Sequence, residues 1–181
     1  MKADSLAIID ENNQTQWVQS ASTTLSVAAS ALAALQAQTS QPLLLVRSFT
    51  DKDGKEELVE YLTEAATALT RDPHAEFATI EVWHADPPDF MYDNLSEVQR
   101  SRYKKVALVT IPRRIGGSEV GDEALLDDVY SRTQNIESAW NPPKPCRSTS
   151  QGDVLVIREG SEWATAMHAV SRVGFTGCRF V

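Results

Sequence analysis

Four largely apolar runs in this chain are only four to seven residues long: Leu43–Val46, Phe77–Trp83, Val106–Ile111 and Val154–Ile157. Each contains branched aliphatic or aromatic side chains and stops at proline, histidine or charged residues. Runs of this length and composition predict β-strands, and the continuous run Leu43–Val46 predicts a strand covered on both faces. The chain therefore needs a sheet, with helices packed on it.

Apolar residues at helical spacing predict three amphipathic helices, over residues 25–38, 56–69 and 122–133. Thr23 or Thr24 can serve as the N-cap of the first helix, because threonine accepts a bond from a free backbone N–H there. The second helix is expected to carry a row of acids on its solvent-facing side. These acids are Glu56, Glu57, Glu60 and Glu64.

Together these elements predict an α+β fold. Residues 1–140 are expected to form an α+β core with an N-terminal layer of strands and helices, including a short helix over 95–102. Residues 141–181 are expected to form a C-terminal three-stranded antiparallel meander, packed on the core as one globular unit. Its predicted strands are 154–157, 163–170 and 172–180.

The net charge of −8 is concentrated in one part of the chain, because residues 41–100 hold thirteen acids and five bases. A negative field opposes direct binding to nucleic acid or to anionic lipid. One interpretation is a solubilising surface. The other is a mimic of nucleic-acid charge that contacts a basic groove of a host protein. The predicted contact acids are Glu56, Glu57, Glu60, Glu64 and Asp89.

The sequence shows neither a secretory signal nor the roughly 20 apolar residues that a membrane span needs. Cys146 and Cys178 do not form a C-x-x-C pattern, and we interpret them as reduced thiols. These features predict a cytoplasmic protein without membrane contact.

No signature of catalysis or metal binding is present. The three histidines lack zinc-ligand spacing, and the glycines do not form a phosphate-binding loop, so we predict no metal and no cofactor. One enzymatic alternative stays open, a small hydrolase-like enzyme with His84 and Asp86 as its catalytic pair, near Trp83 and Arg113. A histidine beside an aspartate at a strand end is also ordinary structural chemistry.

The most informative segment lies near the C-terminus. It reads T-Q-N-I-E-S-A-W, then R-S-T-S-Q-G-D-V, and finally V-G-F. This pattern resembles proteins of phages, plasmids and other mobile elements and, more loosely, the YodL-like domain of mobile-element polyvalent proteins. Gln134 departs from the family pattern, in which a threonine usually precedes the asparagine. We call the matching residues the C-terminal motif: Asn135, Ile136, Trp140, Arg147, Ser148, Thr149, Ser150, Gly152, Asp153, Val154, Gly174 and Phe175.

The motif has two interpretations. In the architectural one, its hydroxyls satisfy a turn, Gly152 supplies a positive φ, and Arg147 pairs with Asp153. In the functional one, Asn135, Trp140, Arg147 and Ser148 line a recognition surface, together with Asp153, because tryptophan and arginine are common binding anchors.

The resemblance implies a mobile-element accessory protein that binds a host macromolecule. In its sharpest form, this is an acidic inhibitor of restriction or CRISPR machinery. The expected partner is a host protein, in particular one that itself binds nucleic acid. A structural or scaffolding module is a third alternative.

Overall fold

The computed structural model describes residues 2–10, 12, 14–20, 22–51, 53, 56–88, 95–135, 140, 146–159 and 166–181, with the side chains of 2–4, 56 and 57 left out. In this described part, three α-helices accompany a mixed sheet of ten strands, and the chain is 24% helix and 45% strand. The fold is α+β, as predicted.

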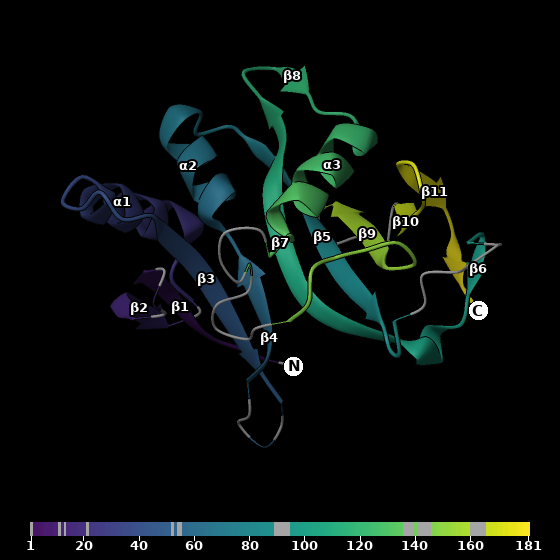
Figure 1. The fold of residues 1–181 in the computed structure, drawn as a ribbon. Helices are drawn as coiled ribbons and strands as arrows, with labels where there is room; N and C mark the ends of the chain where they lie inside the picture. Colours follow the sequence, from purple (N-terminus) through teal and green to yellow (C-terminus); the bar gives the residue numbers. More distant parts are fainter. Residues whose placement is uncertain are drawn as a thin grey trace.

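The large sheet has two halves (Figure 1). The N-terminal half has the order β2-β1-β3-β4, and the C-terminal half has the order β7-β5-β9-β10-β11. The halves are joined by a short parallel pairing of β4 with β7, in which Glu60 lies opposite Leu108 and Tyr61 opposite Val109. The N-terminal strands are β1 (Lys2–Asp10), β2 (Thr15–Ser20), β3 (Leu43–Thr50) and β4 (Glu56–Tyr61). The C-terminal strands are β5 (Glu76–Ala85), β7 (Tyr103–Ile115), β8 (Ser118–Glu119), β9 (Val154–Glu159), β10 (Ala166–Val170) and β11 (Phe175–Gly177).

Helices α1 (Leu25–Gln36) and α2 (Thr63–Arg71) cover the N-terminal half, where Leu45 of β3 packs in their cluster. The N-cap of α1 is Thr24, whose hydroxyl accepts a bond from the Val27 N–H. Side chains alternate along a strand, so Val46, next to Leu45, and its partner Tyr61 point to the other face.

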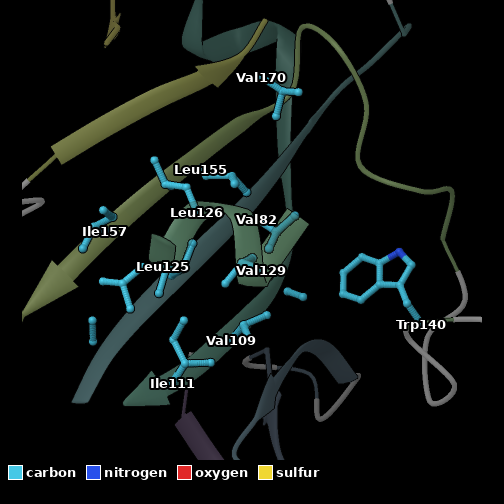
Figure 2. Close-up of a cluster of buried hydrophobic side chains, with 13 residues drawn as sticks. Val82, Val109, Ile111, Leu125, Leu126, Val129, Trp140, Leu155, Ile157 and Val170 are labelled. Atoms are coloured by element: carbon cyan, nitrogen blue, oxygen red, sulfur yellow. The ribbon is translucent and has the colours of Figure 1, made fainter. Parts of the chain in front are cut away.

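That other face carries α3 (Asp122–Arg132) in the C-terminal half, which confirms the predicted third helix. Leu125, Leu126 and Val129 of α3 pack on Ile80 and other residues of the sheet. Figure 2 shows this cluster, with Trp140 at its margin and the indole ring directed toward it. Trp140 comes from outside the helices and strands, and it extends the core beyond α3.

A second, smaller sheet packs on the C-terminal half beside Trp83 and Tyr103. Strands β6 (Glu97–Val98) and β12 (Arg179–Phe180) form a separate two-stranded parallel sheet. Phe180 packs on Trp83 and Tyr103, and the Arg100 guanidinium lies 3.7 Å from the centre of the Trp83 ring system. The predicted helix over 95–102 was wrong, because this segment forms β6 and a single 3-10 turn at Arg100–Arg102.

The predicted helix over 56–69 was also wrong at its start. Residues Glu56–Tyr61 form β4, which pairs antiparallel with β3 and parallel with β7, and α2 begins only at Thr63. Leu58 and Leu62 have helical spacing, but partners distant in sequence on both sides of β4 favour the extended conformation. The predicted row of four glutamates on one helix therefore does not exist.

The C-terminal strands form the predicted antiparallel meander, β9-β10-β11. The meander is part of the large sheet, because β9 pairs with β5 along six residues. Strand β7 extends to Ile115 and forms a hairpin with β8, in which Gly116 and Gly117 both have positive φ. No helix among the described residues is long and apolar enough to cross a membrane.

Candidate functional site

The centre of the C-terminal motif is an ion pair between Arg147 and Asp153. The two guanidinium nitrogens Nη1 and Nη2 each lie 2.6 Å from one carboxylate oxygen. Asp153 is fully buried and also accepts bonds from the backbone N–H groups of Ala85, at 2.9 Å, and Ser150, at 2.8 Å. The predicted Arg147–Asp153 pairing is confirmed, and it fixes the motif to the end of β5. Bidentate charge-assisted bonds of this kind are directional as well as strong.

His84 lies beside this pair. It is 5% exposed, and its Nε2 is 3.2 Å from the Thr149 hydroxyl and 3.9 Å from Asp153 Oδ2. Burial lowers the pKa of His84 to about 4; the Asp153 charge opposes this and the Arg147 charge adds to it. The imidazole is therefore neutral at pH 7, with the Trp140 ring edge-on to it at 6.3 Å.

The residues of the enzymatic alternative do not converge. Asp86 is exposed, and no hydrogen bond or ion pair joins it to His84 within the described residues. Trp83 points to the opposite face, into the cluster with Phe180. Arg113 lies at the other end of the sheet, since Ala85 pairs with the first residue of β7 and Phe77 with Pro112. This arrangement does not form a shared reaction site.

Asn135 and Trp140 form the second part of the motif. The Asn135 side chain donates to the Cys146 carbonyl and accepts from the Trp140 backbone N–H, at 2.8 and 2.9 Å. Its own N–H donates to the Ser148 hydroxyl at 2.8 Å. The indole Nε1 of Trp140 donates to the Arg147 carbonyl at 3.1 Å. Trp140 is thus held at both its backbone and its ring, which orients the indole.

Gln134, the departure from the family pattern, takes part in the same network. Its side-chain amide donates to the carbonyls of Tyr130, at 2.9 Å, and Thr149, at 3.0 Å. The backbone N–H of Thr149 donates to the Thr133 carbonyl at 3.0 Å. These bonds join the motif to the end of α3. The polar groups of the motif are occupied within the protein, which supports the architectural interpretation.

Gly152 has a φ of +88°, the left-handed conformation that the sequence predicts for it. Replacing Gly152 with alanine is expected to lower the free energy of unfolding by about 1–2 kcal/mol, because a Cβ is strained in this region. Urea denaturation checks this value. The control is Gly177→Ala in β11, where an added Cβ meets no atom within 4 Å and φ is not positive. Equal losses in the two variants would contradict the expectation.

Trp140 also forms one wall of a pocket at the junction of the two half-sheets. The pocket has a volume of about 220 Å³. The ring of Tyr61 faces that of Trp140 with centroids 6.1 Å apart and planes inclined by 46°. Glu64 of α2 and Arg132 of α3 form an ion pair of 3.0 Å beside it. We call this the aromatic pocket; its lining residues are Leu44, Tyr61, Thr63, Glu64, Val109, Thr110, Arg132, Thr133 and Trp140.

The predicted contact acids are dispersed. Glu60 is 6% exposed and accepts bonds from Arg47 and from the Thr110 hydroxyl, so it does not belong to a docking surface. Glu64 is paired with Arg132 and lines the aromatic pocket with Trp140. The Glu56 and Glu57 side chains and the whole of Asp89 lie outside the described residues.

A different set of carboxylates does converge, at the end of the C-terminal half near β8. Arg113 contacts Glu119, Asp122 and Glu159, and Arg114 contacts Glu76 and Glu119. Glu123 follows Asp122 in the first turn of α3. We call Glu76, Glu119, Asp122, Glu123 and Glu159 the acidic edge. The sequence does not indicate this cluster, because its members come from β5, β8, α3 and β9.

Among the described residues, no group of three or more histidines, cysteines, aspartates or glutamates is placed to hold a metal ion. Both cysteines are free thiols. Comparisons of the chain with protein-family models, with curated proteins and with solved structures found no match. The resemblance to mobile-element proteins stays a prediction from the C-terminal motif.

Proposed function

We propose that this chain is a mobile-element accessory protein that acts by binding a host macromolecule, with the acidic edge as its contact surface. The observation that supports this proposal is the excess of negative charge there. Four carboxylates contact two arginines and Glu123 follows Asp122 in the first turn of α3, which leaves three negative charges uncompensated within the group. Charge of one sign on a surface steers a partner of the other sign and selects against partners of the same sign.

The acidic edge is both exposed and ordered. The side chains of Glu76 and Glu119 are 63% and 55% exposed, so their charges face solvent. The ion pairs to Arg113 and Arg114 fix the positions of four carboxylates. A cluster of carboxylates reproduces one property of a nucleic-acid backbone, namely a high local density of negative charge. The partner we propose is therefore a basic host protein that handles nucleic acid, such as a restriction or CRISPR component.

The C-terminal motif supports this function indirectly. Asp153 and Arg147 both bond to the Ala85 backbone at the end of β5, and β9, which follows Asp153, carries Glu159 of the acidic edge. The motif thereby stabilises the scaffold on which the carboxylates are displayed. The polar groups of the motif are engaged internally, which favours a supporting role for this part of the chain and leaves partner contact to the acidic edge.

Reversing charge on the acidic edge is expected to weaken partner binding at least about tenfold, because Glu76→Lys with Glu123→Lys changes the group from three excess negative charges to one positive. The partner is first captured from a bacterial lysate with the wild-type chain. The Kd of the purified pair is then measured at several salt concentrations, where the wild-type affinity should fall as salt rises.

The matched control is Asp53→Lys with Asp86→Lys. It makes the same change in net charge at exposed positions elsewhere, one in the β3–β4 connection and one beyond the opposite end of β5 from Glu76. This variant should bind within about twofold of wild type. Equal affinity of the edge variant and the control, or an affinity independent of salt, would remove the acidic edge from the proposal.

A further inference from the structure

We infer that the aromatic pocket is a binding site for a small planar aromatic molecule of one or two rings. The inference goes beyond the proposed function, since it concerns a different surface and needs no macromolecular partner. It starts from two aromatic rings that both line the pocket and contact each other in a tilted arrangement, those of Tyr61 and Trp140. Aromatic rings attract one another in offset and tilted arrangements, so a third ring beside this pair is favoured over an aliphatic group of equal size.

The pocket is held open by the C-terminal motif. In a protein core, side chains that are free to move normally fill a void. Trp140 cannot move into this void, because its backbone N–H is bonded to Asn135 and its indole N–H to the Arg147 carbonyl. Tyr61 is in turn packed against two clusters of the core. The motif therefore produces a pre-formed cavity, which is the usual state of small-molecule sites.

The size of the pocket limits the ligand. An apolar cavity of about 150 Å³ holds one benzene molecule. The volume of about 220 Å³ here is larger and suits one substituted ring or two fused rings.

The lining also defines the polarity of the ligand. Leu44 and Val109 contribute aliphatic surface. The hydroxyls at the pocket already have partners: Thr63 accepts from the Leu45 N–H, Thr110 donates to Glu60, and Thr133 donates to the Tyr130 carbonyl. Recognition inside the pocket therefore depends on ring contact and apolar burial. A polar substituent of the ligand would lie near the paired charges of Glu64 and Arg132, where half-exposed donors and acceptors are present.

The test uses the full chain and three probes. Phenol is compared with cyclohexanol, which has the same hydroxyl on a non-aromatic ring, and indole provides the two-ring probe. Binding is followed by chemical-shift changes of the Trp140 indole N–H and of the Thr133 amide. We expect saturable binding of phenol and indole, with Kd values of roughly 0.1–1 mM for ligands of this size, and cyclohexanol at least about fivefold weaker.

Two variants locate the site. Leu44→Trp fills the pocket from its half-buried wall and is expected to abolish binding. Tyr61→Leu removes one ring and should weaken binding at least about fivefold. The matched control is Tyr130→Leu, which removes a half-buried tyrosine that contacts Phe175 away from the pocket and should leave binding unchanged.

Three outcomes would overturn the inference: no saturable binding of either aromatic probe, equal binding of phenol and cyclohexanol, or binding unaffected by Leu44→Trp. A pocket that is occupied only in the presence of a host protein would also overturn it, since the occupant would then be a side chain of that partner. Failure here leaves the macromolecular proposal standing, because the acidic edge and its variants are measured separately. Should Tyr61→Leu fail to fold, Leu44→Trp still decides the question.

Discussion

Replacing Asp153 with alanine is expected to lower the free energy of unfolding by about 3–5 kcal/mol, the largest effect of any single exchange we predict. Asp153 is fully buried, and its loss would deprive the Arg147 guanidinium of its partner and leave the N–H groups of Ala85 and Ser150 without an acceptor. Urea denaturation followed by far-ultraviolet circular dichroism measures this change. The variant should also show altered signals for Trp140, because Arg147 positions the indole.

The control for Asp153 is another arginine–aspartate pair in the same chain. Asp128 and Arg132 lie one turn apart on α3 with both side chains about 40% exposed. Asp128→Ala should cost only about 0.3–0.5 kcal/mol, because exposed pairs gain little in water. A loss for Asp153→Ala as small as that for Asp128→Ala would show that the ion pair does not fix the motif. The double variant Arg147→Leu with Asp153→Leu should be less destabilised than the sum of its two single variants.

The second large effect is a loss of stability in acid that depends on His84. Its pKa is about 4 in the folded protein and about 6.5 in an unfolded chain. Because the folded pKa is the lower of the two, unfolding takes up a proton between these values. The contribution of His84 to stability is therefore fully present above pH 6.5 and is lost as the pH falls toward 4. The difference amounts to about 3 kcal/mol.

Comparison with His84→Gln isolates this effect. Glutamine can bond to the Thr149 hydroxyl but does not titrate, so the variant lacks the proton uptake of His84. Between pH 7 and pH 4 the wild type should lose about 3 kcal/mol more unfolding free energy than the variant. Parallel stability curves for the two proteins would contradict the assignment of His84 as a buried neutral residue.

The turn of the motif was predictable because its signals are local. A glycine at a positive φ, hydroxyls beside it and an arginine six residues before an aspartate are all within one short segment. Helices α1 and α3 were predictable for the same reason, since their apolar spacing and, for α1, the N-cap lie within the segment itself. Local signals of this kind do not depend on the rest of the fold.

The strand β4 was not predictable, because its conformation depends on partners that lie far away in the sequence. Tyr61 pairs with Val46 on one side and with Val109 on the other. The aromatic pocket was missed as a consequence, since it needs Tyr61 at the end of β4 and Arg132 at the end of α3. No pattern within either segment indicates that these two ends meet.

The acidic edge could not be located from the charge distribution along the chain, for a related reason. Counting carboxylates along the chain does not distinguish exposed ones from those that become buried. Glu60 is covered by Arg47, and Glu81 accepts bonds from Lys105 and Trp83 and lies 2.7 Å from Arg158. Burial alone would raise the pKa of the Glu81 carboxyl, but the bonds from Arg158, Lys105 and Trp83 together lower it. The excess negative charge instead lies at the acidic edge, where one end each of β5, β8, α3 and β9 meet. Only the tertiary structure brings these four ends together.

The position of β9 has a consequence for synthesis. Strand β5 is made early, yet its second neighbour, β9, follows about seventy residues later along the chain. Until β9 has left the ribosome, the edge of β5 that later pairs with β9 has unpaired amide and carbonyl groups. Exposed strand edges of this kind promote aggregation. Nascent chains that stop short of β9 should depend on chaperones, whereas pairing of β9 with β5 covers this edge.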